Sequence, residues 1–343
     1  MVAEKVGGSM KPIGVIVVAI LVAILSSCGQ KPFAEKLPLK IGAEFSQCTC
    51  AACVAYEKGW YGEEGFEIVS YQSYVSGGAL SSAMAKGYVD VAYIGLVPAI
   101  IALSKSATPF KIVSGIYRYG YAFVANSSKI RSVKDLERHD ARIACPHEGS
   151  GANAFLQATL ETYRLDKTKV MSHVDRMNPH KILASLSAGE LDGGFVPEHW
   201  VSVAESKGFT VLLTCKDVTP CISGAVLVVR ESLIAKHPEA VKRLVQMTAQ
   251  SIEYVKSNPG DAAMITSRHL SHRLKRTNEA EKVELSGFEE VTPEMCIQAM
   301  KRIEFSPTID VKDVQLLINN LHRFRIIENS IKAEDILDLR FVK

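Results

Sequence analysis

The chain has 343 residues, of which 47% are hydrophobic, and it carries a formal net charge of +3. A chain of this length can bury one large core or two ordinary ones. Its charge is nearly balanced and it has no basic stripe with interleaved aromatic residues, which argues against nucleic acid as a partner. The densest basic run, residues 268–282, is followed by acidic residues, and we interpret it as a solvated face.

The N-terminus has the layout of a secretory signal. Two lysines precede an apolar run over residues 13–25, which is too short to span a bilayer comfortably. The LSSC motif that ends at Cys28 resembles a prokaryotic lipobox, which would place a lipid on that cysteine. We predict a signal peptide over residues 1–27, a lipidated linker over residues 28–38, and a mature protein that is extracytoplasmic and anchored to the membrane. A simple N-terminal anchor would give nearly the same location.

Strand-like and helix-like segments alternate along the chain, which predicts an α/β fold with mostly parallel sheets. The expected strands cover residues 39–45, 66–71, 89–95, 110–117, 121–125, 141–146, 191–197, 209–214 and 223–229. Beyond Pro238 the chain is predicted to be mainly helical, over residues 239–256, 261–270, 293–303 and 311–324.

Three cysteines, Cys48, Cys50 and Cys53, lie in the turn between the first strand and the next helix. Such a turn leaves unpaired N–H groups at the carboxyl end of the strand, where open α/β sheets bind ligands. Soft thiolates select soft or borderline metals, so one hypothesis is a site for a metal ion, a metal chelate or a thiophilic compound, completed by His147 or His199. The alternatives are cysteines that pack the helix on the sheet, or a Cys50–Cys53 or Cys48–Cys53 disulfide.

Other strand-to-helix turns carry glycine beside a hydroxyl or a proline. There the backbone N–H groups stand next to a helix dipole, an arrangement that favours an oxyanion or a small organic anion. An ordinary βα turn has the same sequence features, but we favour the anion over the metal. The residues expected near such a ligand are Ser76, Gly77, Gly95, Leu96, Gly149, Ser150 and Gly151.

The order and spacing of several segments resemble the periplasmic substrate-binding proteins of ABC importers. Within them, the chain is most similar to the branch that takes nitrate, sulfonates, taurine and thiamine-pyrimidine precursors. The resemblance runs from about residue 39 to about residue 270. Its segments are residues 55–60, 64–68, 85–92, 110–113, 132–136 and 188–193.

The resemblance implies a two-lobed periplasmic-binding-protein fold of type II, with the ligand cleft between lobes joined by crossing strands. Lobe 1 would comprise residues 39–118 and 224–343, including the C-terminal helices, and lobe 2 residues 119–223. A monomeric protein of this kind captures a small solute and delivers it to a membrane permease and its ATPase subunit, without a cofactor and without catalysis.

The chain departs from the family pattern at three places. It has Cys48, Thr49 and Cys50 where many relatives carry a polar or His-Pro-like turn, and Glu198 follows Pro197 where relatives often have a Trp-Glu-Pro-like segment. Tyr117, near the crossover between the lobes, could supply an aromatic wall. We therefore expect Thr49, Tyr117 and Glu198 near the ligand as well.

One alternative belongs to a different class of function. A related branch of this fold resembles enzymes of thiamine-pyrimidine synthesis, which use a cysteine-rich iron-binding segment and a lysine-bound pyridoxal phosphate. The cysteine cluster of this chain echoes that segment only loosely. The export signal argues against the enzyme, because its cofactors belong in the cytoplasm.

Overall fold

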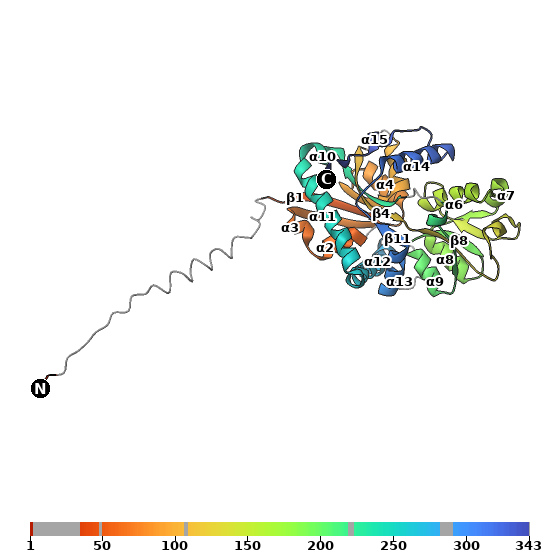
Figure 1. The fold of residues 1–343 in the computed structure, drawn as a ribbon, viewed down its shortest axis with the longest axis horizontal. Coiled ribbons are helices and arrows are strands. Elements are labelled where there is room, and N and C mark those ends of the chain that lie inside the picture. The colour runs from red at the N-terminus through yellow and green to blue at the C-terminus, as the bar shows by residue number, and fades with distance from the viewer. Residues whose placement is uncertain (3–34, 48–49, 106–108, 219–222, 282–290, 343) are drawn as a thin grey trace. The chain divides into compact units, whose positions relative to one another are not determined.

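In the computed structural model, the strands of this chain form two mixed sheets (Figure 1). The structure describes residues 1–2, 35–47, 50–105, 109–218, 223–281 and 291–342, without the side chains of residues 272–281. Residues 37–343 form one compact unit that contains both sheets. Cys28, Cys48, Thr49 and nearly all of the predicted signal peptide lie outside the described residues.

The first sheet has six strands in the order β11-β4-β10-β3-β1-β2. β1 pairs in parallel with β2 and β3, whereas β10 runs antiparallel to β3 and β4. All five residues of the apolar run in β3 are buried, as expected for a central strand covered on both faces. The strands are β1 (Leu37–Glu44), β2 (Phe66–Tyr74), β3 (Val91–Gly95), β4 (Phe110–Tyr119), β10 (Ser223–Arg230) and β11 (Ile303–Phe305).

The second sheet has five strands in the order β7-β6-β8-β5-β9. β6 pairs in parallel with β7 and β8, while β5 runs antiparallel to β8 and β9. The strands are β5 (Tyr121–Ala125), β6 (Ile143–Cys145), β7 (Val174–Arg176), β8 (Gly193–Pro197) and β9 (Thr210–Thr214). β5 follows β4 directly through Gly120, so the chain passes from one sheet to the other within one residue.

Helices cover both sheets. Several begin at caps that the sequence supplies: Ser76 accepts a hydrogen bond from Ala79 N at 3.2 Å, and Ser150 accepts one from Asn153 N at 3.1 Å. The α-helices are α2 (Cys50–Glu57), α3 (Trp60–Glu63), α4 (Gly77–Ala85), α5 (Leu96–Leu103), α6 (Gly151–Thr162), α7 (Lys167–Met171), α8 (Pro179–Ser187), α9 (Trp200–Ser206), α10 (Glu231–Lys236), α11 (Pro238–Ser257), α12 (Pro259–Glu281), α13 (Pro293–Arg302), α14 (Val311–Arg323) and α15 (Ala333–Ile336). The 3-10 turns are η2 (Val133–Glu137), η3 (Cys215–Asp217) and η4 (Leu339–Phe341).

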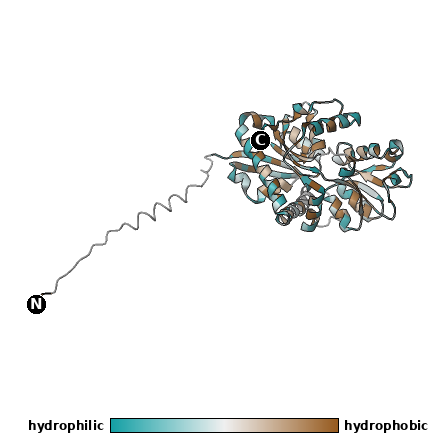
Figure 2. Ribbon diagram, in the orientation of Figure 1, coloured by the Kyte–Doolittle hydropathy of each residue, from teal (hydrophilic) through white to brown (hydrophobic). Residues whose placement is uncertain are grey.

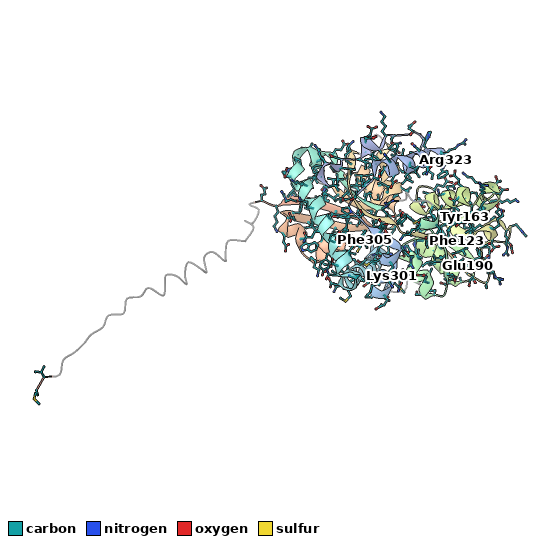
Figure 3. All side chains as sticks on the ribbon, viewed as in Figure 1. Phe123, Tyr163, Glu190, Lys301, Phe305 and Arg323 are labelled. Carbon is teal, nitrogen blue, oxygen red and sulfur yellow. The ribbon has the colours of Figure 1, made fainter. Side chains whose placement is uncertain are left out.

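Each sheet has apolar clusters of its own. Figure 2 shows hydrophilic and hydrophobic segments along the outer helices, which fits helices that turn one face to a core. Figure 3 separates Phe305 of β11 from Phe123 of β5, which packs on Phe195 in the second sheet with ring centroids 4.7 Å apart. The C-terminal segment is not confined to the first sheet, because α13 packs against α9.

The structure confirms the predicted α/β class, and most strand boundaries agree within two or three residues. The prediction of mostly parallel sheets is wrong, because four of the described strand pairs are parallel and five are antiparallel. β2 extends to Tyr74, three residues beyond its predicted end, because it pairs with β1 along the whole length of β1. After β1, α2 ends at Glu57 and the short α3 begins at Trp60, with Gly59 between them at a φ of 77°. Among the helices described, none has both the length and the apolar character required to cross a bilayer. The two sheets divide near the predicted lobe boundaries, but their behaviour as separate lobes stays a prediction.

Candidate ligand-binding site

A pocket of about 520 Å³, partly open to solvent, lies where the two sheets face each other. Its walls come mainly from the segments that follow β1, β2, β6, β7 and β8, at the carboxyl ends of parallel strands. Open α/β sheets bind ligands at these ends because the next helix begins there with unpaired N–H groups. The lining residues are Glu44, Phe45, Ser46, Val75, Ser76, Gly77, Gly78, Pro98, Tyr121, Pro146, His147, Gly149, Ser150, Gly151, Ala152, Asn178, Pro179, Pro197 and Trp200.

On the side of the first sheet, Glu44 ends β1 and faces two helix N-termini. Its Oε2 accepts a hydrogen bond from Gly95 N, which precedes α5, at 2.9 Å, and its carboxylate also accepts one from Gly77 N in α4. Burial raises the pKa of the Glu44 carboxyl above its usual value, against the two backbone donors, which lower it. A Cβ on Gly77 would stand 2.3 Å from Pro98 Cγ, so glycine allows α4 and α5 to approach this closely.

On the side of the second sheet, the loop after β6 leads into α6. The Ser150 hydroxyl caps the helix, and a Cβ on Gly151 would stand 2.1 Å from Tyr121 Oη, so only glycine leaves room for this tyrosine. His147 reaches toward the first sheet, because a Cβ on Gly78 would lie 3.5 Å from its Nε2. The two sides therefore come within a side chain's length of each other at this point.

The charge of the lining is unusual for an anion site. Among the lining residues that the structure describes, Glu44 is the one carboxylate, His147 is the one imidazole, and there is no lysine or arginine. The rest of the wall consists of aromatic residues, prolines, glycines and small apolar residues, with three serines and one asparagine.

Behind the pocket wall lie two buried polar side chains, Gln47 and His199. Both are 0% exposed. Within the part of the chain that the structure describes, neither ring nitrogen of His199 has a hydrogen-bond partner, whereas the Gln47 side chain faces the Cys50 thiol. His199 packs between aromatic rings, 5.7 Å from Phe45 and 4.6 Å from Trp200 between centroids. Burial lowers the pKa of His199 to about 3, so the imidazole is neutral.

The structure brings five of the predicted ligand residues together at the pocket. They come from two separate turns, which are the turn before α4 on the first sheet and the turn before α6 on the second sheet. They are Ser76, Gly77, Gly149, Ser150 and Gly151. Gly95 is adjacent through its bond to Glu44, whereas the Leu96 side chain is buried in the apolar core.

Tyr117 and Glu198 do not line the pocket. The Tyr117 ring packs over Gly224, where a Cβ would stand 2.1 Å from the ring, and against Phe305. Glu198, with 1% of its side chain exposed, forms an ion pair with Arg302 of α13, whose Nη2 lies 3.3 Å from Glu198 Oε2. Burial raises the pKa of Glu198 to about 7 despite this partner. The expected ligand contact is thus replaced by an internal contact between α13 and the turn before α9.

Cys50 and Cys53 also lie away from the pocket lining. Both are free thiols that pack with Val54 of α2 against α11 and α12, so they do not form the Cys50–Cys53 disulfide. Thr266 donates a hydrogen bond to Cys50 Sγ at 3.5 Å, and burial raises the pKa of Cys50 to about 12. The described residues include no group of three or more His, Cys, Asp or Glu side chains placed to hold a metal ion.

Sequence reasoning missed most of the other lining residues, among them Glu44, Phe45, Tyr121 and Trp200. A signal was present for Glu44, since it is a lone acid at the carboxyl end of an otherwise apolar strand. The position of Tyr121 depends on a chain reversal from β4 to β5 that residue patterns do not specify.

Comparison with known proteins places the chain in a family. Residues 33–269 match the NMT1-like family, which is more than half of the sequence. The chain belongs to the NMT1-like family. One relative is the bicarbonate transport ATP-binding protein CmpC of Synechocystis, 25% identical over 239 residues; the match covers 64% of this chain and 35% of that longer protein. Another is the taurine-binding periplasmic protein of Escherichia coli, 26% identical over 216 residues, with 61% and 64% covered.

Solved structures share the fold of this NMT1-like protein. The ligand-binding component of an ABC-type import system from Staphylococcus aureus, solved with zinc bound, aligns with a TM-score of 0.73 and 17% identity over 89% of this chain and 98% of that one. The alkanesulfonate-binding protein SsuA of Xanthomonas axonopodis aligns with a TM-score of 0.71 and 14% identity, over 90% of this chain and 100% of that one. The nitrate-binding protein NrtA of Synechocystis aligns with a TM-score of 0.65 and 14% identity, over 90% of this chain and 87% of that one. The fold is therefore that of periplasmic binding proteins.

Proposed function

We propose that this NMT1-like protein is the extracytoplasmic solute-binding component of an ABC importer. The observation that carries the proposal is the pocket, because its walls come from both sheets and meet at the carboxyl ends of their strands. The relatives add support, since they include a taurine-binding periplasmic protein and part of a bicarbonate transporter. A small solute bound there needs no chemistry from the protein, only enclosure and hydrogen bonds.

The connection between the sheets suits closure around a solute. Tyr119 and Gly120, which join β4 to β5, have φ angles of 68° and 90°. A short connection of this kind can serve as a hinge that changes the separation of the pocket walls. A permease and its ATPase then recognise the closed form, and a lipid on Cys28 keeps the protein at the membrane surface in this proposal.

The pocket can be tested by filling it. Gly78 lies in the first turn of α4 and lines the pocket, so Gly78→Leu projects a side chain toward His147. Gly260 holds the same position in α12, with no atom within 4 Å of its ideal Cβ, so Gly260→Leu is the matched control. We expect native mass spectrometry of protein purified from its own cells to show a bound small solute in the wild type and in Gly260→Leu, and at least tenfold less in Gly78→Leu.

Two results would contradict the proposal. A solute that remains fully bound in folded Gly78→Leu would place the binding site elsewhere. Wild-type protein that carries no solute, and is not stabilised against heat by taurine, bicarbonate, nitrate, guanidinium, benzamidine or benzoate, would contradict the transport role itself.

A further inference from the structure

Glu44 occupies the place where an oxyanion would be expected to bind. The N-termini of α4 and α5 converge on it, and its carboxylate accepts the N–H groups of Gly77 and Gly95. Backbone N–H groups and helix dipoles at such ends are what attract an anionic ligand. Here the protein's own carboxylate already uses them.

An anion beside Glu44 would meet repulsion from the carboxylate. Like charges at close range repel strongly where water is largely excluded. No lysine or arginine stands among the described lining residues to offset that repulsion. The first-sheet side of the pocket is therefore unfavourable for a nitrate, a sulfonate or a carboxylate.

The same carboxylate is well placed to accept further hydrogen bonds. A carboxylate has about four lone-pair sites, and the two backbone donors use two of them. Glu44 is not fully covered and lines the pocket, so its remaining acceptor capacity is directed at whatever the pocket holds. The partner that satisfies it is a hydrogen-bond donor, and a cationic N–H group satisfies it most strongly because it also neutralises the charge.

The remaining wall favours an organic ligand over an inorganic cation. Phe45, Tyr121 and Trp200 contribute aromatic surface, which packs against flat or apolar groups and attracts organic cations. A hard metal ion requires several oxygen ligands. Among the described residues no group of three acidic, histidine or cysteine side chains provides them.

We propose that Glu44 determines the specificity of the pocket and that the solute presents a cationic amine or amidine group to it, not an oxyanion. The inference rests on the proposed function, since it names the chemical class of the transported solute. It departs from the sequence analysis, which favoured an anion at the helix N-termini of Ser76-Gly77 and Gly95-Leu96.

Two pairs of probes with matched shape test the proposal. Guanidinium and nitrate are both small and planar, and benzamidine and benzoate share a phenyl ring with opposite charge. Thermal unfolding and isothermal titration of the wild type should show stabilisation by guanidinium or benzamidine and none by nitrate or benzoate. In Glu44→Gln, which keeps an acceptor oxygen but removes the charge, we expect the affinity for the cationic probe to fall at least tenfold. Glu44→Asp, which keeps the charge, should lose less.

Asp135→Asn is the matched control. Asp135 also accepts two backbone N–H groups, from Arg131 at 2.8 Å and Ser132 at 2.9 Å, but it lies in η2 and does not line the pocket. The affinity of Asp135→Asn for the cationic probe should equal that of the wild type. If the loss in Glu44→Gln came only from a destabilised turn, the affinity would fall in Asp135→Asn as well.

Two outcomes would overturn the assignment of Glu44. One is binding of benzoate or nitrate that Glu44→Gln does not change but Gly78→Leu abolishes. This outcome would contradict the role of Glu44 and would still be compatible with the pocket and the transport role. The other is a native solute, identified by mass spectrometry, without a cationic N–H group. If none of the four probes binds, the native solute provides the test: a cationic N–H group in it supports the assignment of Glu44, and its absence contradicts that assignment.

Discussion

The two sides of the pocket use the same structural motif in different ways. On the first sheet, the N-termini of α4 and α5 are closed by Glu44, a side chain from the neighbouring strand. On the second sheet, the N-terminus of α6 packs around Tyr121, and its own Ser150 caps it as Ser76 caps α4. A strand–turn–helix unit therefore marks the edge of a binding site, but the side chain that meets the helix end decides which ligand is accepted.

The largest combined loss of stability and solute affinity should come from filling the space between Gly151 and Tyr121. A Cβ on Gly151 would overlap Tyr121 Oη at 2.1 Å, whereas one on Gly149 would make an ordinary contact of 3.5 Å with Ile101. We expect Gly151→Val to lower the free energy of unfolding by about 1–3 kcal/mol. Its affinity for the native solute should fall at least tenfold, because Tyr121 lines the pocket. Gly149→Val should change both quantities much less.

Urea unfolding and titration with the purified solute measure both effects. Replacing Tyr121 with Ala in the Gly151→Val background should restore most of the lost stability, because the overlap is removed. Equal losses in Gly149→Val and Gly151→Val would mean that the whole loop, and not the approach of Tyr121, limits this side of the pocket.

The sequence predicted the second side better than the first. The capping serine and the glycines of residues 149–151 are local signals, so the turn could be recognised without knowing its neighbours. Glu44 receives its role from Gly77 and Gly95, which are distant in sequence and meet it only through the pairing of β1 with β2 and β3. Likewise, the partner of Glu198 is Arg302, 104 residues away, and no local pattern announces that pair.

An intermediate effect is expected behind the wall, at His199. Its folded-state pKa of about 3 lies below the ordinary value of 6.5, so below pH 6.5 the unfolded chain binds a proton that the folded protein refuses. Stability from this group is present above pH 6.5 and is lost as the pH falls toward 3, with a slope of up to about 1.4 kcal/mol per pH unit. His199→Phe should flatten this loss and leave stability at pH 7 nearly unchanged or slightly higher.

Urea unfolding at a series of pH values between 4 and 7.5 provides the measurement. His322→Phe, at an exposed position in α14, is the control and should keep the acid dependence of the wild type. An unchanged slope in His199→Phe would mean that His199 is protonated in the folded state, and therefore has a partner that neutralises its charge.

The smallest effect should come from the turn after β1, which the cysteines made the most conspicuous stretch of the sequence. Cys50 and Cys53 fill apolar space between α2 and α12 and do not reach the pocket lining, so Cys50→Ala with Cys53→Ala removes packing and little else. We expect a loss of about 1–2 kcal/mol in unfolding free energy. The affinity for the solute should stay within about twofold, as in Cys145→Ala, a control at another buried thiol.

Elemental analysis of the wild type, Cys145→Ala and the double variant decides whether the thiols bind a metal. Zinc that is bound stoichiometrically by the wild type and by Cys145→Ala, but lost from the double variant, would return these thiols to the binding site. That result would make the first side of the pocket a metal centre and Glu44 its neighbour.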